Sequence, residues 1–221
     1  MLHLYALADH PARLTAAAGI DGSQLRTAQI GGALDAVVSD VSPHGVPANE
    51  AAILTHAAVV DELAGVNEAL LPARFGPGYQ GEDALAQAIE SREVQIREAL
   101  ECVRGCVELG LRIFDGDVAA NGSNGSSGRE YMLGRLQEVQ TAERIAAEVH
   151  ETLAVTARES TSRVLASPQL LLSAAYLLPR EELESFRSAL DETERRHPRL
   201  TFVCTGPWPP YSFALIDGDR A

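Results

Sequence analysis

A proline-rich segment near the C-terminus constrains the fold more than any other part of the chain. Residues 205–213 hold three of the eleven prolines and the only tryptophan of the sequence. Each proline fixes φ and lacks a backbone N–H donor, and the residue before it is restricted to extended geometry. No regular helix can contain this segment, so we expect an extended ribbon that presents Trp208 and Tyr211.

Two roles are open to Trp208 in such a ribbon. A large aromatic side chain either fills a hydrophobic core beside a kinked edge strand or serves as a rigid anchor for a partner. We expect Trp208 to lie in the core and Tyr211 to lie closer to the surface, and the partner anchor is the alternative.

Length and charge restrict the class of protein. The 221 residues suit one large domain or two small ones, and 46% hydrophobic residues are enough to form a core. The net charge of −13 and the lack of lysine argue against nucleic-acid binding, which needs clustered cations. No apolar run approaches the ~20 residues of a membrane span, and the N-terminus lacks the basic region of a signal peptide. We therefore expect a cytoplasmic protein that binds neither nucleic acid nor membrane.

Residues 1–101 are expected to form an α+β domain. The runs of strand length are residues 2–8, 26–30 and 34–41, with two glycines as the hairpin connection between the last two. One amphipathic helix is expected to follow Pro47. A second is expected over residues 82–100, with Arg92 interrupting its apolar stripe.

Residues 102–221 are expected to form a second α+β domain, which is ferredoxin-like. Its predicted order is strand, long helix, strand, helix, strand, with the nearly continuous apolar run at 170–178 as a central strand covered on both faces. The long helix carries an apolar stripe from Met132 to Leu153 and is expected to continue to about Leu165. Either part of it projects beyond a compact domain, or it lies across the sheet with one frayed end. Residues 115–128 are rich in Gly, Ser and Asn and are predicted to form a flexible loop, because they have too little apolar surface to become ordered.

Tests for catalytic, cofactor and metal-binding motifs give no candidate. The sequence has no Walker motif and no nucleophile placed between a strand and a helix. The six histidines are scattered, with no His-x-x-x-His pair. The three cysteines, Cys102, Cys106 and Cys204, are expected to be small buried apolar residues. We therefore predict no catalytic residue, no cofactor and no metal, and we do not expect an enzyme.

Two polar residues stand out by their local sequence. His56 lies on the apolar face of the first expected helix, where a satisfied histidine in the core or at a domain interface is favoured over a catalytic one. Arg74 lies in a Leu-Pro-x-Arg-Phe-Gly turn, where its guanidinium can tie the turn to a carboxylate or a carbonyl. The candidates for structural or partner contacts are thus His56, Arg74, Trp208 and Tyr211.

Several blocks of the sequence occur in the order that one known family has them. They are Leu-Tyr-Ala at 4–6, the strand at 34–39, Leu-Thr-His at 54–56, Leu-Pro-Ala-Arg-Phe-Gly at 71–76, the strand at 107–114 and Thr-Gly-Pro-Trp-Pro-Pro-Tyr-Ser-Phe at 205–213. Together they resemble the GvpF and GvpL family of gas vesicle accessory proteins over nearly the whole chain. The family usually has tryptophan at the position of Leu109 and often has lysine at that of Arg112.

The resemblance implies an accessory function in building gas vesicles, the gas-filled protein shells that give cells buoyancy. It also implies a two-domain α+β fold, a cytoplasmic location in association with the vesicles, and binding to the hydrophobic shell protein GvpA and other Gvp proteins. A chaperone-like adaptor is physically reasonable, because a shell subunit with an aggregation-prone apolar face needs shielding before it joins the wall. The alternative is a small-molecule-binding regulatory or enzymatic ferredoxin-like protein, since that fold supports many activities.

Overall fold

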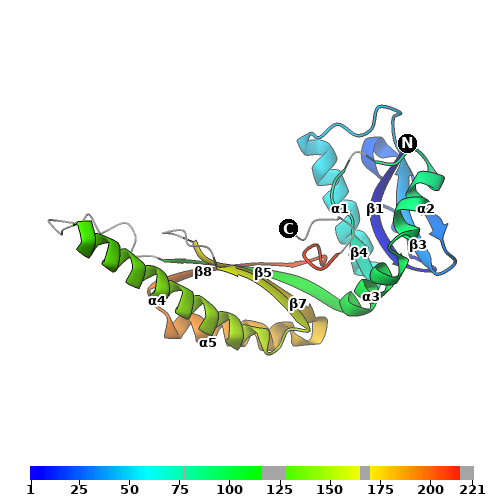
Figure 1. Ribbon diagram of the computed structural model, residues 1–221. Helices are drawn as coiled ribbons and strands as arrows, with labels where there is room; N and C mark the ends of the chain where they lie inside the picture. Colours follow the sequence, from blue (N-terminus) through cyan, green and yellow to red (C-terminus); the bar gives the residue numbers. More distant parts are fainter. Residues whose placement is uncertain (77, 116–127, 165–169, 215–221) are drawn as a thin grey trace. The chain divides into compact units, whose positions relative to one another are not determined.

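The computed structural model describes residues 1–76, 78–115, 128–164 and 170–214. The chain divides into two compact units, the first comprising Met1–Val107 with Trp208–Ala221 and the second Glu108–Pro207. Both units combine helices with a four-stranded sheet (Figure 1), so the predicted α+β class is confirmed. Nearly all of the flexible loop predicted at 115–128 lies outside the described residues.

The sheet of the first unit is antiparallel. Its strands are β1 (Leu2–Asp9), β2 (Leu25–Ile30), β3 (Leu34–Asp40) and β4 (Leu70–Pro72), in the order β2-β3-β1-β4. The predicted hairpin between β2 and β3 is confirmed, and Gly31 and Gly32 take positive φ values of 59° and 82° in its turn. The two inner strands are buried along almost their whole length, as expected for strands covered on both faces.

The helices of the first unit are α1 (Glu50–Val66), α2 (Glu82–Glu90) and α3 (Glu93–Val103), preceded by a short 3-10 turn, η1 (Ile20–Gly22). Asn49 caps α1 by accepting a hydrogen bond of 2.9 Å from the Ala52 N–H, which fixes the start of the helix shortly after Pro47. α1 packs Val59 and Leu63, among others, against Tyr5 of β1 in one apolar cluster. α2 contacts β2, and α3 contacts β4.

The prediction of a single helix over residues 82–100 is wrong, because the chain breaks at Ser91 and Arg92. The Ser91 hydroxyl donates to the Ala88 carbonyl at 3.1 Å, and the Arg92 N–H donates to the Ile89 carbonyl at 2.9 Å. These bonds close α2 in a tight turn, and Arg92 takes non-helical angles of φ −130° and ψ 16°. The interruption of the apolar stripe at Arg92 is thus the boundary between α2 and α3.

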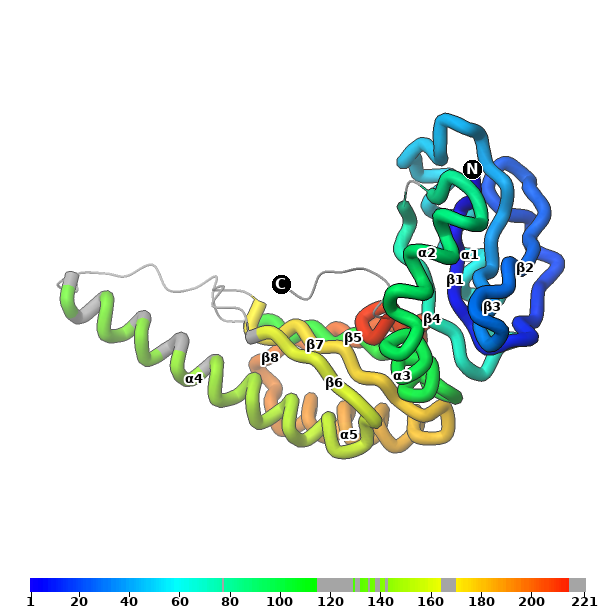
Figure 2. The backbone as a smooth tube through the Cα atoms, turned by 45° about the vertical axis from the view of Figure 1, so that its right-hand side comes forward, coloured from blue at the N-terminus to red at the C-terminus, as the bar shows by residue number. Residues whose placement is uncertain are grey.

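In the second unit, α4 (Gly128–Ala154) and α5 (Leu183–Arg196) lie on the same side of the sheet (Figures 1 and 2). The strands are β5 (Cys106–Asp115), β6 (Glu159–Val164), β7 (Leu170–Pro179) and β8 (Leu200–Trp208), in the order β6-β7-β5-β8, and a 3-10 turn, η2 (Arg180–Glu182), leads into α5. Tyr176 of β7 and Phe186 of α5 are fully buried in the core between sheet and helices. The predicted central strand at 170–178 is confirmed, since β7 lies between β5 and β6 and is buried along most of its length.

The prediction that the long helix continues to about Leu165 is also wrong. α4 ends at Ala154, about 40 Å from its start at 1.5 Å per residue, and β6 follows. Thr161 of β6 pairs with Ala175 of the antiparallel strand β7. The hydroxyl side chains at 160–162 have low helix propensity, and the strand pairing available from β7 decides their conformation. No helix among the described residues combines the length and the apolarity needed to cross a bilayer.

Candidate functional site

Two hydrogen bonds hold His56 inside the first unit. Its Nε2 lies 2.9 Å from the carbonyl oxygen of Ala73, and its Nδ1 lies 2.8 Å from Nε2 of His3 on β1. A carbonyl oxygen only accepts, so His56 Nε2 carries the proton and His56 Nδ1 accepts from His3 Nε2–H. Both rings are thereby fixed in one tautomer, and both side chains are buried.

Aromatic side chains enclose the two histidines. The Tyr5 ring stacks on His56 with centroids 5.4 Å apart, and Phe75 meets His56 edge-on at 5.8 Å. His3 packs edge-on against Tyr5 at 4.9 Å. The Tyr5 hydroxyl accepts a hydrogen bond of 2.9 Å from the Ile20 N–H, so its polar end is also paired. We refer to His3, Tyr5, His56 and Phe75 as the histidine cluster.

The loop that carries Phe75 is tied closely to β1. Leu2 and Tyr79 exchange two backbone hydrogen bonds of 2.8 Å each. Gly78 has a φ of 88°, and a Cβ at this position would lie 2.6 Å from the Leu2 carbonyl oxygen. Only glycine fits this close approach, which holds the loop over the histidine cluster.

Burial keeps both histidines uncharged. Burial and repulsion from His56 lower the pKa of His3 from 6.5 to about 4, and burial lowers the pKa of His56. A hydrogen bond with the backbone of Gly76 acts on the pKa of His3 in the opposite direction, but burial outweighs it. At neutral pH both His3 and His56 are therefore uncharged. Their two hydrogen bonds, from His3 to His56 and from His56 to Ala73, join β1, α1 and the loop after β4.

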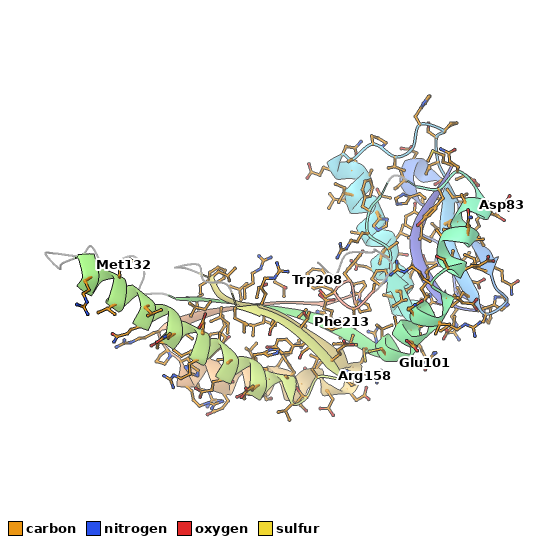
Figure 3. All side chains as sticks on the ribbon, viewed as in Figure 1. Asp83, Glu101, Met132, Arg158, Trp208 and Phe213 are labelled. Atoms are coloured by element: carbon orange, nitrogen blue, oxygen red, sulfur yellow. The ribbon has the colours of Figure 1, made fainter. Side chains whose placement is uncertain are left out.

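The other predicted residues lie in different environments. Arg74 is exposed and follows Ala73, the residue whose carbonyl binds His56. Tyr211 is partly buried against the apolar cluster of the first unit, and burial together with the charge of Asp61 raises its pKa to about 12. Trp208 is 48% exposed at the end of β8 (Figure 3). The hydrogen-bond partners of His56 described above are His3 and Ala73, and they do not include Arg74, Trp208 or Tyr211.

The prediction that Trp208 fills the core, with Tyr211 nearer to the surface, is wrong. After Trp208 the chain turns, with the Tyr211 N–H donating to the Pro209 carbonyl at 2.8 Å and the Phe213 N–H to the Pro210 carbonyl at 3.2 Å. The turn buries Phe213, which is only 5% exposed. The extended ribbon therefore ends at Trp208, and Phe213 occupies the core position predicted for Trp208.

We expect Trp208→Ala to lower the free energy of unfolding by about 2 kcal/mol, roughly half the cost of removing a fully buried ring, because about half of the side chain is exposed. Phe213→Ala is the matched control from the same turn and should destabilise the protein clearly more. Urea denaturation of both variants tests this. A Trp208→Ala loss as large as that of Phe213→Ala would contradict the exposed position.

Sequence reasoning alone misses three members of the histidine cluster, namely His3, Tyr5 and Phe75. His3 and Tyr5 are two residues apart on a strand, so their side chains share one face. That spacing, together with His56 on the apolar face of a helix, was the available signal. The partnership itself spans 53 residues and follows only from the fold.

The cysteines differ from the prediction at one position. Cys106 is buried, Cys102 is partly buried and Cys204 is exposed, so the expected burial is wrong for Cys204. Across the described residues, no three His, Cys, Asp or Glu side chains come together in a way that could hold a metal ion.

Known proteins match the chain along nearly its whole length. The profile of the family described as gas vesicle synthesis protein GvpL/GvpF matches residues 1–215. Gas vesicle protein F1 of Halobacterium salinarum is 28% identical over 185 residues, which cover 83% of this chain and 78% of that protein. Gas vesicle protein L of a Streptomyces species is 28% identical over 183 residues, which cover 73% of this chain and 68% of that protein.

Solved structures share the fold. The crystal structure of the gas vesicle protein GvpF from Anabaena sp. PCC7120 matches with a TM-score of 0.80 at 20% identity, covering 100% of this chain and 98% of that one. The structure of GvpF from Microcystis aeruginosa matches with a TM-score of 0.77 at 21% identity, covering 96% and 98%. The resemblance seen in the sequence blocks is thereby confirmed, and the chain belongs to the GvpL/GvpF family of gas vesicle synthesis proteins.

Proposed function

We propose that this gas vesicle accessory protein is a non-catalytic, chaperone-like adaptor that binds the hydrophobic shell protein GvpA and other Gvp proteins. One observation carries the proposal, namely the exposed apolar surface of α4. A shell subunit must present apolar surface to its neighbours in the wall, and an adaptor with a complementary apolar surface can cover it until assembly. The family relationship supports a place for the chain in gas vesicle formation.

The apolar stripe of α4 divides into a buried half and an exposed half. Ala146, Val149 and Leu153 are buried against the sheet and α5. Met132 and Leu136, earlier on the same stripe, are 68% and 53% exposed, and Met132 lies near the end of the helix that projects past the sheet (Figure 3). Leu133 is exposed beside them. Large apolar side chains that continue a packed stripe beyond the core are typical of a surface that a partner covers.

The proposed arrangement has two domains, and the second is ferredoxin-like. Support comes from the element order β5-α4-β6-β7-α5-β8, from the strand order β6-β7-β5-β8 and from the two helices on one side of the sheet. The sequence-based boundary between residues 101 and 102 lies a few residues before the division of the compact units at Val107. Trp208 is half-exposed and follows the second boundary between the units, which lies between Pro207 and Trp208. It is a second candidate partner contact in this proposal.

We expect the double variant Met132→Glu with Leu136→Glu to weaken binding to GvpA about tenfold or more, because it places charge in an apolar contact. The fold should persist, since both side chains are exposed. The matched control is Gln137→Glu with Thr141→Glu, which adds the same charge at exposed polar positions of the same helix. Pull-down and titration with purified GvpA measure the effect.

Each outcome of this experiment has a definite meaning. Failure of the wild-type chain to bind GvpA would overturn the adaptor proposal. Binding that is equally strong in the Met132/Leu136 variant and in the wild type would remove α4 as the contact surface. Equal loss in the control variant would assign the effect to net charge rather than to the apolar surface.

A further inference from the structure

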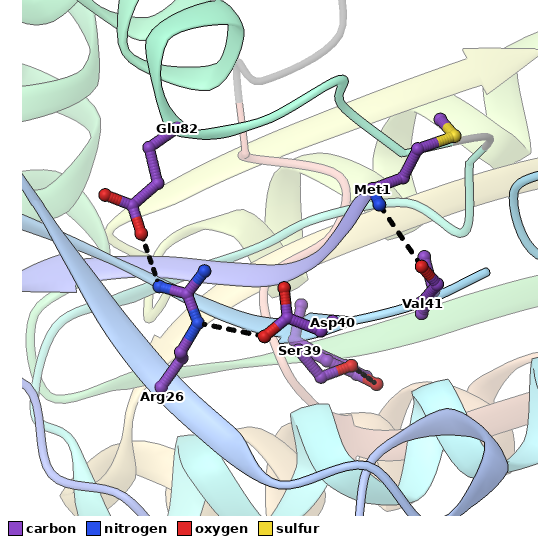
Figure 4. A network of polar contacts seen from close by, with 7 residues as sticks. Met1, Arg26, Ser39, Asp40, Val41 and Glu82 are labelled. Carbon is purple, nitrogen blue, oxygen red and sulfur yellow. Dashed lines mark hydrogen bonds and ion pairs between the residues drawn. The ribbon is translucent and has the colours of Figure 1, made fainter. Parts of the chain in front are cut away.

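Three of the four sheet edges carry features that block pairing with another strand. At the β2 edge, Arg26 forms ion pairs with Asp40 at 3.4 Å and with Glu82 at 2.6 Å, which places charges along the strand (Figure 4). β4 is three residues long and ends in Pro72. β6 carries two charged residues, Glu159 and Arg163, among its six. Charge, shortness and proline are the usual protections of an exposed edge.

The fourth edge, β8, lacks this protection along most of its length. β8 has nine residues with no charged side chain, and its proline comes only near the end, at position 207. In the described part of the chain it pairs with β5 alone, so its outer backbone groups face away from the sheet. Thr201, Val203 and Thr205 are exposed, and residues 201–205 have high strand propensity. An edge of this kind is a template for a further strand.

Residues 201–205, Thr-Phe-Val-Cys-Thr, are nearly self-complementary when paired antiparallel. A twofold axis at Val203 sets Thr201 opposite Thr205 of the second copy, Phe202 opposite Cys204, and Val203 opposite itself. Thr–Thr and β-branched pairs are stabilising across antiparallel strands, and no charge meets a like charge. We propose that the β8 edge binds a second copy of this chain through antiparallel β8–β8 pairing centred on Val203.

The charges of α5 complement this arrangement. Arg187 and Glu194 of α5 are the charged groups that act on the thiol of Cys204 in β8, and they shift its pKa in opposite directions. The two residues are seven positions apart on α5, so they lie on the same side of that helix, and Arg187 also forms an ion pair of 3.3 Å with Glu184 of its own helix. The twofold axis makes the two α5 helices antiparallel, so the end of one helix that carries Arg187 runs in the same direction as the end of the other that carries Glu194, and opposite rather than like charges face each other. The alternative partner is a strand from a different protein. Pairing with such a strand would not require residues 201–205 to be self-complementary, so their self-complementary order favours a second copy of this chain.

The acidic net charge does not prevent the pairing. At physiological salt, charges further away than about 8 Å are largely screened, so the uncharged edge and the flanking α5 charges dominate the contact. The contact is small, one strand pair with two helix flanks, and we expect a dimer that dissociates on dilution. This inference does not depend on the adaptor function.

Charge at the symmetry axis tests the proposal. Sedimentation velocity of the full chain under reducing conditions should show a concentration-dependent monomer–dimer equilibrium. Val203→Lys and Val203→Glu should each raise the dimer dissociation constant about tenfold or more, because like charges then face each other at the axis. An equimolar mixture of the two variants should restore a dimer, since opposite charges meet. Thr161→Lys, an exposed position on the β6 edge, is the matched control and should dimerise as the wild type does.

Amide hydrogen exchange of β8 provides a second measurement if a charged variant folds poorly. In the wild-type chain, protection of residues 201–205 should rise with protein concentration. A wild-type chain that stays monomeric at every concentration overturns the proposal. So does a Val203→Lys dimer as stable as the wild type, or a mixture of the two variants that stays monomeric. Protection of β8 that appears only when a different protein is added would assign the edge to that protein.

Discussion

Replacing His56 with alanine is expected to lower the free energy of unfolding by about 3–5 kcal/mol. The substitution removes a buried ring from the histidine cluster and leaves the Ala73 carbonyl and the His3 Nε2–H without partners. A cavity among aromatic side chains and two unpaired buried polar groups each cost stability, and the costs add in the same direction. Urea denaturation monitored by circular dichroism measures the loss.

His56→Gln is the matched control, because glutamine can both donate and accept at this position. Its amide nitrogen can donate to the Ala73 carbonyl and its amide oxygen can accept from His3, so we expect less than half of the loss seen with alanine. Gas vesicle formation should follow stability across the two variants if the histidine is structural. Full stability of His56→Gln with complete loss of vesicles would show that His56 has a role beyond holding the fold.

The stability of the protein is expected to fall by up to about 3 kcal/mol as the pH decreases from 6.5 to 4. The pKa of His3 is about 4 in the folded chain and 6.5 in the unfolded chain, so the unfolded chain binds more protons in this window. At 1.36 kcal/mol per pH unit, that difference corresponds to about 3 kcal/mol. The stabilisation is complete above the unfolded pKa and is lost as the pH falls toward the folded pKa. His56, with its pKa also lowered by burial, changes stability in the same direction.

Denaturation curves across this pH range measure the effect, but carboxylates also titrate there. His3→Gln isolates the imidazole, because glutamine still donates a hydrogen bond to His56 and does not titrate in this window. The variant should show a shallower pH dependence than the wild type. An identical slope in both proteins would mean that His3 is not the group responsible.

Local signals in the sequence identify the elements whose conformation depends on their own residues. The apolar run at 170–178 predicts a covered strand, and the two glycines after residue 30 predict a hairpin, because each pattern specifies local geometry. The segment at 159–164 is different. Its composition is only a weak helix former, and it becomes a strand because it pairs with the next strand, β7, a pairing that the composition of 159–164 does not specify.

Long-range partnership also explains what could not be predicted at the site. His56 was identified on a helix face, but its partner His3 lies 53 residues away and is placed by the order of the strands. The choice between Trp208 and Phe213 for the core depends on where the proline-rich segment turns. Proline restricts the backbone angles there without fixing the direction in which the next side chain points. The composition of the segment is therefore compatible with either aromatic residue inside.

The division of the chain bears on the order of events during its synthesis. The second unit is one continuous stretch of the sequence, Glu108–Pro207. The first unit consists of two segments, one that precedes this stretch in the sequence and one that follows it. Tyr211, which packs against the apolar cluster of the first unit, and Phe213 belong to the later segment. On the ribosome, domains usually complete folding from the N-terminus onward. Here the packing of the first unit is completed only when Tyr211 and Phe213 emerge at the end of synthesis, whereas all residues of the second unit are made before them.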